Sequence, residues 1–202
     1  METKKKKFSP EESLSLISEM INNVKGEYRQ NAFYFLFWGW IITLSCITHF
    51  TGIRILLHFE MYNKIGLLSF INWGIFIISG VVIQYWYRAR KPKKALSLYN
   101  KFFNVLWQIG GLAMIVSAFI SINFNVYPVL IILVITAMST LVTGIVIRFT
   151  PLILGGIVFF IASLVSTYFL YEYSLIVSAV AIILGYIIPG YLLKNSKSNQ
   201  HV

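Results

Sequence analysis

The sequence predicts an all-α polytopic membrane protein, with six transmembrane helices in three hairpins and an N-terminal cytoplasmic amphipathic helix. Of its 202 residues 57% are hydrophobic and 12% are charged, and the mean hydropathy is +0.74. A soluble domain carries about a quarter charged residues, so this chain is expected to lie in lipid. Apolar segments near the spanning length of about 20 residues recur, and basic residues gather between them. We expect one membrane domain.

Residues 1–31 are predicted to form the cytoplasmic helix. Ser9 can cap it, Pro10 suits the first helical position, and Glu12 stands where a capping box needs an acid. Gly26 offers a place to bend before the membrane. Apolar residues then recur at alternating steps of three and four, which indicates a heptad-like seam. We predict that this seam binds a partner through Leu14, Ile17, Ile21, Val24 and Tyr28.

The polar face of this helix is net acidic, with four glutamates against Lys25 and Arg29. A helix that lies on anionic lipid usually has a basic polar face. Packing against protein is therefore favoured. The candidates are a second copy, another cytoplasmic or membrane protein, or the cytoplasmic ends of the chain's own spans.

The transmembrane domain is predicted over 32–193 and the cytoplasmic tail over 194–202. An uncharged run rich in aromatic residues opens the first span, as expected where a helix meets the headgroups. Between the first two spans we expect a loop over 51–65. Pro128 opens the fourth span, and Thr150 is expected to cap the fifth. The six spans are about 33–50, 66–87, 102–122, 128–148, 151–170 and 174–193.

The charges orient the chain. If the N-terminus is cytoplasmic, all but two of the 17 lysines and arginines lie inside, and the exceptions are Arg54 and Lys64. Such a bias predicts that both termini are cytoplasmic. The net charge of +10 is explained by these topology signals, so no nucleic-acid partner is expected. The block at 88–94 could also hold anionic headgroups.

No reactive group is evident. The chain has no aspartate, and none of its glutamates falls in the middle of a span, which disfavours an ion-coupled transporter. No catalytic triad or phosphate loop appears, so neither an enzyme nor a cofactor is predicted. His49, His58 and Glu60 are interpreted as polar residues near the interface, without a metal. The single cysteine, Cys46, precludes an intramolecular disulfide.

The fourth span carries Thr136, Thr140 and Gly144 at four-residue intervals. This stripe of small residues predicts close packing against a neighbouring helix, and the alternative is a polar pathway through the bundle. Gln84 and Gln108 are expected to form an interhelical bond, with a ligand from the cytoplasm as the alternative. Pro189 is expected to kink the sixth span.

The segment from Glu12 to Ile21, then Lys25 and the run from Phe33 to Trp40, resembles an uncharacterised family of small bacterial multi-pass membrane proteins. The resemblance covers about the first 50 residues and implies a bacterial inner membrane, with no functional residues to carry over. The leading hypothesis is a non-enzymatic accessory or regulatory protein that docks a partner or a second copy through 9–30. The alternative is an uncoupled channel or transporter for a small, largely apolar solute.

Overall fold

The computed structural model describes the backbone of residues 10–90, 98–124, 126–169 and 171–195. Side chains are described from Ala32 onward, with breaks at 91–100, 122, 125 and 170–171. Apart from short turns these residues are helical, and they contain no strand, so the all-α fold class is confirmed.

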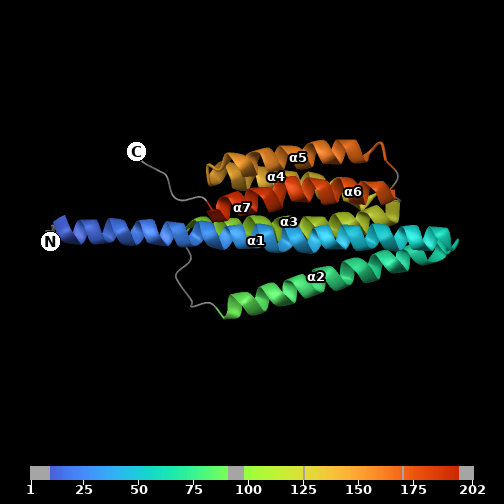
Figure 1. The fold of residues 1–202 in the computed structure, drawn as a ribbon, viewed down its shortest axis with the longest axis horizontal. Coiled ribbons are helices and arrows are strands. Elements are labelled where there is room, and N and C mark those ends of the chain that lie inside the picture. The colour runs from blue at the N-terminus through green and yellow to red at the C-terminus, as the bar shows by residue number, and fades with distance from the viewer. Residues whose placement is uncertain (1–9, 91–97, 125, 170, 196–202) are drawn as a thin grey trace.

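The helices follow one another with short connections (Figure 1). In order, they are α1 (Pro10–His58), the 3₁₀ turn η1 (Tyr62–Lys64), α2 (Ile65–Ala89), α3 (Leu98–Phe124), α4 (Pro128–Val146), α5 (Thr150–Ser166), α6 (Tyr171–Ile182), the π-helical segment η2 (Ile183–Ile187) and α7 (Ile188–Asn195).

Five helical segments of the described chain are long and apolar enough to cross a membrane, which indicates a membrane protein. They are Ala32–His58, Tyr62–Ala89, Lys101–Ser121, Pro128–Val146 and Glu172–Asn195. The remaining apolar helix, Thr150–Ser166, has 17 residues and is shorter.

Helix α1 differs from its expected shape. It continues through Gly26 and past residue 50 without interruption, so the expected loop at 51–65 is wrong over its first eight residues. No proline follows Pro10 in this helix, and the Thr51 hydroxyl donates to the carbonyl of Ile47 at 2.8 Å, within the helix itself. Nothing therefore breaks the backbone ladder until His58.

Both α1 and α4 end in a Schellman motif without glycine. After α1, the amide of Met61 donates to Leu56 O and that of Glu60 to Leu57 O, with Glu60 at φ 56°. Arg148 takes the equivalent position after α4, at φ 54°. Because this second motif leaves one extended residue, Phe149, before α5, Thr150 is already helical and does not cap it. The expected cap at Thr150 is wrong.

The helices divide into a packed group and two peripheral members. Helices α4 and α5 pack most extensively, α6 with η2 and α7 lies against α5 and α1, and α3 rests on α4. Helix α2 packs on α1 and diverges from it towards the end near Ala89 (Figure 1). In the most apolar window of α2 and of α3 only 11% of the residues are buried, against 44% in α4 and 56% in the segment from Glu172 to Asn195.

Candidate functional site

The N-terminal part of α1 extends past the ends of the other helices (Figure 1). The predicted docking positions Leu14, Ile17, Ile21, Val24 and Tyr28 all lie on this helical backbone. Their side chains fall outside the described residues, so only their register along the helix is established.

The predicted stripe on α4 lies in the packed group. A Cβ built on Gly144 would lie 2.8 Å from the backbone nitrogen of Ile153, so α4 and α5 meet there with almost no side chain between them. Thr140 is fully buried, and its hydroxyl donates to Thr136 O at 2.6 Å. All three stripe residues are therefore enclosed by neighbouring helices.

Tyr186 lies at the centre of this packed group. Its hydroxyl is 3.2 Å from the Thr140 hydroxyl. Its ring contacts aromatic side chains from three other helices, with centroid distances of 4.9 to 6.0 Å, and these are Phe35, Trp107 and Phe159. A tyrosine in lipid needs a partner for its hydroxyl. Thr140 provides that partner within the helix bundle.

The π-helical segment that carries Tyr186 has a local cause. Pro189 has no amide hydrogen, and its ring would clash with the carbonyl of Gly185 in a regular α-helix. Residues Ile183–Ile187 widen into π geometry directly before it. The effect of Pro189 on the helix is thus this widening, and the expected kink stays a prediction. The carbonyl of Gly185 then faces α5, where a Cβ on Gly155 would lie 2.5 Å from its oxygen.

A second polar site joins α1 to α2. The Asn72 side-chain amide donates to Ser45 O at 3.1 Å and to Ser45 Oγ at 2.9 Å, and its carbonyl accepts from Thr48 Oγ1 at 2.8 Å. Nearer the cytoplasmic ends expected from the charges, Trp38 Nε1 donates to Gln84 Oε1 at 2.6 Å. We call the hydrogen bonds between α1 and α2 the α1–α2 polar seam. It comprises these bonds of Asn72 and Gln84 and the bonds of His49 to Ser69 and Trp73.

His49 is fully buried in this seam. Trp73 Nε1 can only donate, so its 3.1 Å bond requires His49 Nδ1 to accept. The Ser69 hydroxyl donates to Ile65 O, which leaves its oxygen to accept from His49 Nε2 at 2.8 Å. The imidazole is thus neutral, and it links α1 to α2 through both ring nitrogens.

Two expectations about polar side chains change accordingly. Gln84 bonds to Trp38 rather than to Gln108, which is exposed on α3. His49 is separated from the exposed His58 and Glu60, and the described residues hold no group of three side chains suited to bind a metal.

The end of the bundle near His58 carries one ion pair among the described residues. Arg54 Nη1 lies 3.4 Å from Glu172 Oε1, which joins α1 to the first turn of α6. The Glu172 side chain is 11% exposed and that of Arg54 is 53% exposed. Arg54 therefore has a carboxylate partner, unlike the other basic residue at this end, Lys64.

Sequence reasoning did not single out Asn72, Trp38 or Tyr186. A usable signal existed for Asn72, because a side-chain amide in the middle of an apolar span calls for an interhelical partner. No comparable signal marks Tyr186, since tyrosines are frequent throughout this chain.

No protein-family model, no curated protein and no solved structure matches this chain. The resemblance of the first 50 residues to a bacterial family therefore stays a prediction.

Proposed function

We propose that this protein is a non-enzymatic, multi-pass protein of a bacterial inner membrane that docks a second protein chain through residues 10–30 of α1, which we call the N-terminal extension. The observation that carries the proposal is the length of α1, which has 49 residues. At 1.5 Å per residue it is about 74 Å long, and a bilayer core of about 30 Å accounts for less than half of that.

Within the part of the chain that the structure describes, the extension reaches beyond the ends of the other helices (Figure 1). Figure 1 shows that it continues along the axis of the spanning part instead of folding beneath the bundle. Five apolar positions recur along it at a period near 3.5, from Leu14 to Tyr28, so they share one face of the helix. Covering such an apolar face with another protein removes it from water, which is favourable.

A second copy of the chain is the partner that we favour, because its presence and its orientation in the membrane need no separate assumption. Two copies in one membrane have the same orientation, so their extensions emerge on the same side and run parallel. Equivalent seam positions can then meet across a two-fold axis, as in a parallel coiled coil.

The proposed topology has six spans and cytoplasmic termini. Figure 1 places the N-terminal extension of α1 and the end of α7 at the same end of the bundle. The basic residues concentrate in the segments expected there. Helix α5, at 17 residues, is about 26 Å long, close to the thickness of the hydrocarbon core.

The alternative of an uncoupled channel has less support. Thr140 is fully buried, and Gly144 lies against the backbone of α5. The non-enzymatic assignment draws support from Asn72, whose bond joins two helices, and from Thr140 and Thr143, whose hydroxyls donate to carbonyls of their own helix.

Disulfide cross-linking tests the docking proposal. The native Cys46 is buried in the bundle, so a cysteine placed on the extension is the accessible one. Ile17→Cys is expected to form an oxidant-dependent dimer in membranes, because position 17 lies in the seam. The control Ser15→Cys lies off the seam and is expected to stay mostly monomeric.

Light scattering in mild detergent supplies the second measurement. The full-length protein is expected to have the mass of a dimer, and Ile17→Asp with Ile21→Asp is expected to halve it. The control pair Ser15→Asp with Asn22→Asp adds the same charge off the seam and is expected to leave the dimer intact. If the wild type is monomeric in light scattering and Ile17→Cys forms no cross-linked dimer, docking to a second copy is overturned.

A further inference from the structure

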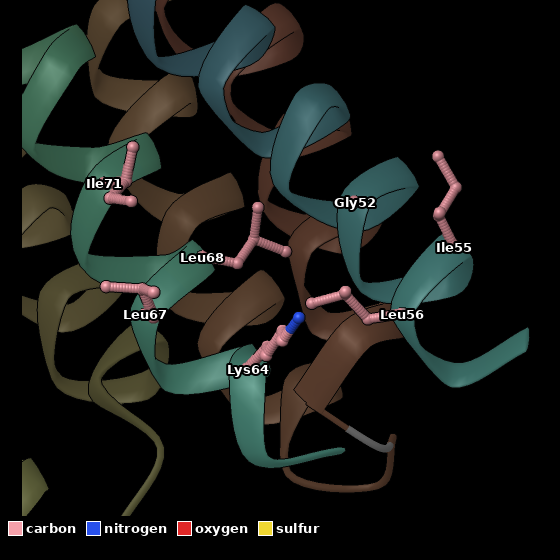
Figure 2. Close-up of a pocket in the computed structure, with 7 residues that line it drawn as sticks. All are labelled: Gly52, Ile55, Leu56, Lys64, Leu67, Leu68 and Ile71. Atoms are coloured by element: carbon pink, nitrogen blue, oxygen red, sulfur yellow. The ribbon is translucent and has the colours of Figure 1, made fainter. Parts of the chain in front are cut away.

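An apolar groove of about 300 Å³ lies between α1 and α2, next to the turn that joins them. Such a volume is at the lower end of the range for ligand pockets, about 300–1,000 Å³. Figure 2 shows the walls, which come from the C-terminal part of α1 and from the end of η1 with the first turns of α2. The lining residues are Gly52, Ile55, Leu56, Lys64, Leu67, Leu68 and Ile71.

Lys64 is the one charged residue of the lining. Figure 2 shows its ammonium end directed towards the space between Leu56 and Leu68. No carboxylate of the described residues pairs with it, since the ion pair at this end joins Arg54 to Glu172. An unpaired cation thus stands at the mouth of an apolar groove.

The position of the groove defines the ligand chemistry that fits. It lies where α1 ends at His58 and α2 begins at Ile65, which is the level at which a spanning hairpin meets the headgroups. Lys64 is the only lining side chain that can donate a hydrogen bond to a polar solute, because the other lining side chains are aliphatic. An acyl chain suits the walls, and an anionic phosphate suits the ammonium group.

We infer that this groove binds an anionic phospholipid, with one acyl chain between α1 and α2 and the headgroup phosphate on Lys64. The site is separate from the N-terminal extension of α1 and does not depend on the proposed docking function.

Native mass spectrometry of the full-length protein tests this inference. The protein is released from micelles that contain dioleoyl phosphatidylglycerol and dioleoyl phosphatidylcholine in equal amounts. One basic residue near the surface is expected to give about a fivefold preference for the anionic lipid. Lys64→Gln is expected to remove that preference, whereas Lys101→Gln, which removes a charge away from the groove, is expected to retain it.

A second pair of variants tests the acyl chain. Ile71→Trp places an indole at the groove and is expected to reduce the retention of both lipids. Ile78→Trp makes the same change two turns along α2, at a position that is 66% exposed and outside the lining, and is expected to have little effect. An anionic preference that persists in Lys64→Gln, or equal losses in the two tryptophan variants, would overturn the inference.

Discussion

The contacts among α4, α5, η2 and α7, inside the packed group, and the contacts between α1 and α2 hold helices together in different ways. Lipid tails are as apolar as the helix surfaces, so little hydrophobic force drives helices together within a bilayer. In the packed group, glycines bring backbones into direct contact, as Gly144 does with Ile153 and Gly155 with Gly185. Between α1 and α2, glycines meet side chains instead of backbone, Gly52 at Leu68 and Gly80 at Trp38, and side-chain hydrogen bonds join the two helices.

The difference teaches which part of the molecule can move alone. Contacts between backbones tolerate almost no displacement, because neither helix can retreat without losing its other neighbours. Helix α2 packs on α1 and on the turn η1, and most of its surface is exposed to the bilayer. It can therefore separate without disturbing the packed group.

The largest effect is expected from a single methyl group in the packed group. Gly155→Ala places a Cβ 2.5 Å from the Gly185 carbonyl oxygen. Since the atoms that this Cβ meets belong to the backbone of Gly185, they cannot move aside and the helices must separate. We expect a loss of about 3 kcal/mol in the free energy of unfolding, measured by thermal or denaturant unfolding in micelles. Gly111→Ala is the control: a Cβ there meets nothing within 4 Å, so it should be neutral or slightly stabilising.

The next effect concerns the α1–α2 polar seam. Asn72→Leu removes three hydrogen bonds to Ser45 and Thr48 and is expected to cost about 1 kcal/mol. Hydrogen–deuterium exchange should accelerate in α2 and stay unchanged in α5. Ser79→Ala, which removes a bond within α2 itself, is expected to change neither. Faster exchange in both helices would refute the independence of α2.

A smaller effect is expected where a polar bond lies inside the packed group. Tyr186→Phe and Thr140→Val each remove one side of the 3.2 Å contact between hydroxyls. A double-mutant cycle should give a coupling free energy of about 0.6 kcal/mol. A coupling above the cost of Gly155→Ala would mean that polar bonds, and not backbone contacts, hold this region together.

The smallest effect is expected from the ion pair between α1 and α6. Arg54 is largely exposed, so Arg54→Gln should change the free energy of unfolding by at most about 0.5 kcal/mol. Raising the salt concentration should reduce even that difference between variant and wild type. A larger, salt-independent loss would show that Arg54 acts through packing rather than charge.

The helical class could be predicted because composition and apolar length depend on the residues alone. Pro128 correctly marked the start of α4, since proline suits only the first turn of a helix. The end of α1 was missed for the converse reason: its Schellman motif uses Glu60, a residue that carries no general signal for a left-handed backbone.

The polar contacts could not be predicted because they depend on how each helix is rotated about its axis. Gln84 and Gln108 lie at corresponding depths in the sequence pattern, yet the rotation of α2 turns Gln84 towards Trp38. The enclosure of Thr140 by Tyr186 likewise depends on the π-helical segment, which shifts the face that the following residues present. The docking role of the extension stays a prediction.

The continuity of α1 has a mechanical consequence. Because α1 runs without interruption from Pro10 to His58, it is stiff along its whole length. A sideways pull on the N-terminal end, which the proposed docking would exert, strains the contacts of α1 with α6, η2 and α7 and the pair formed by Arg54 and Glu172. A load at one end of the bundle is thereby carried to the other end along a single helix.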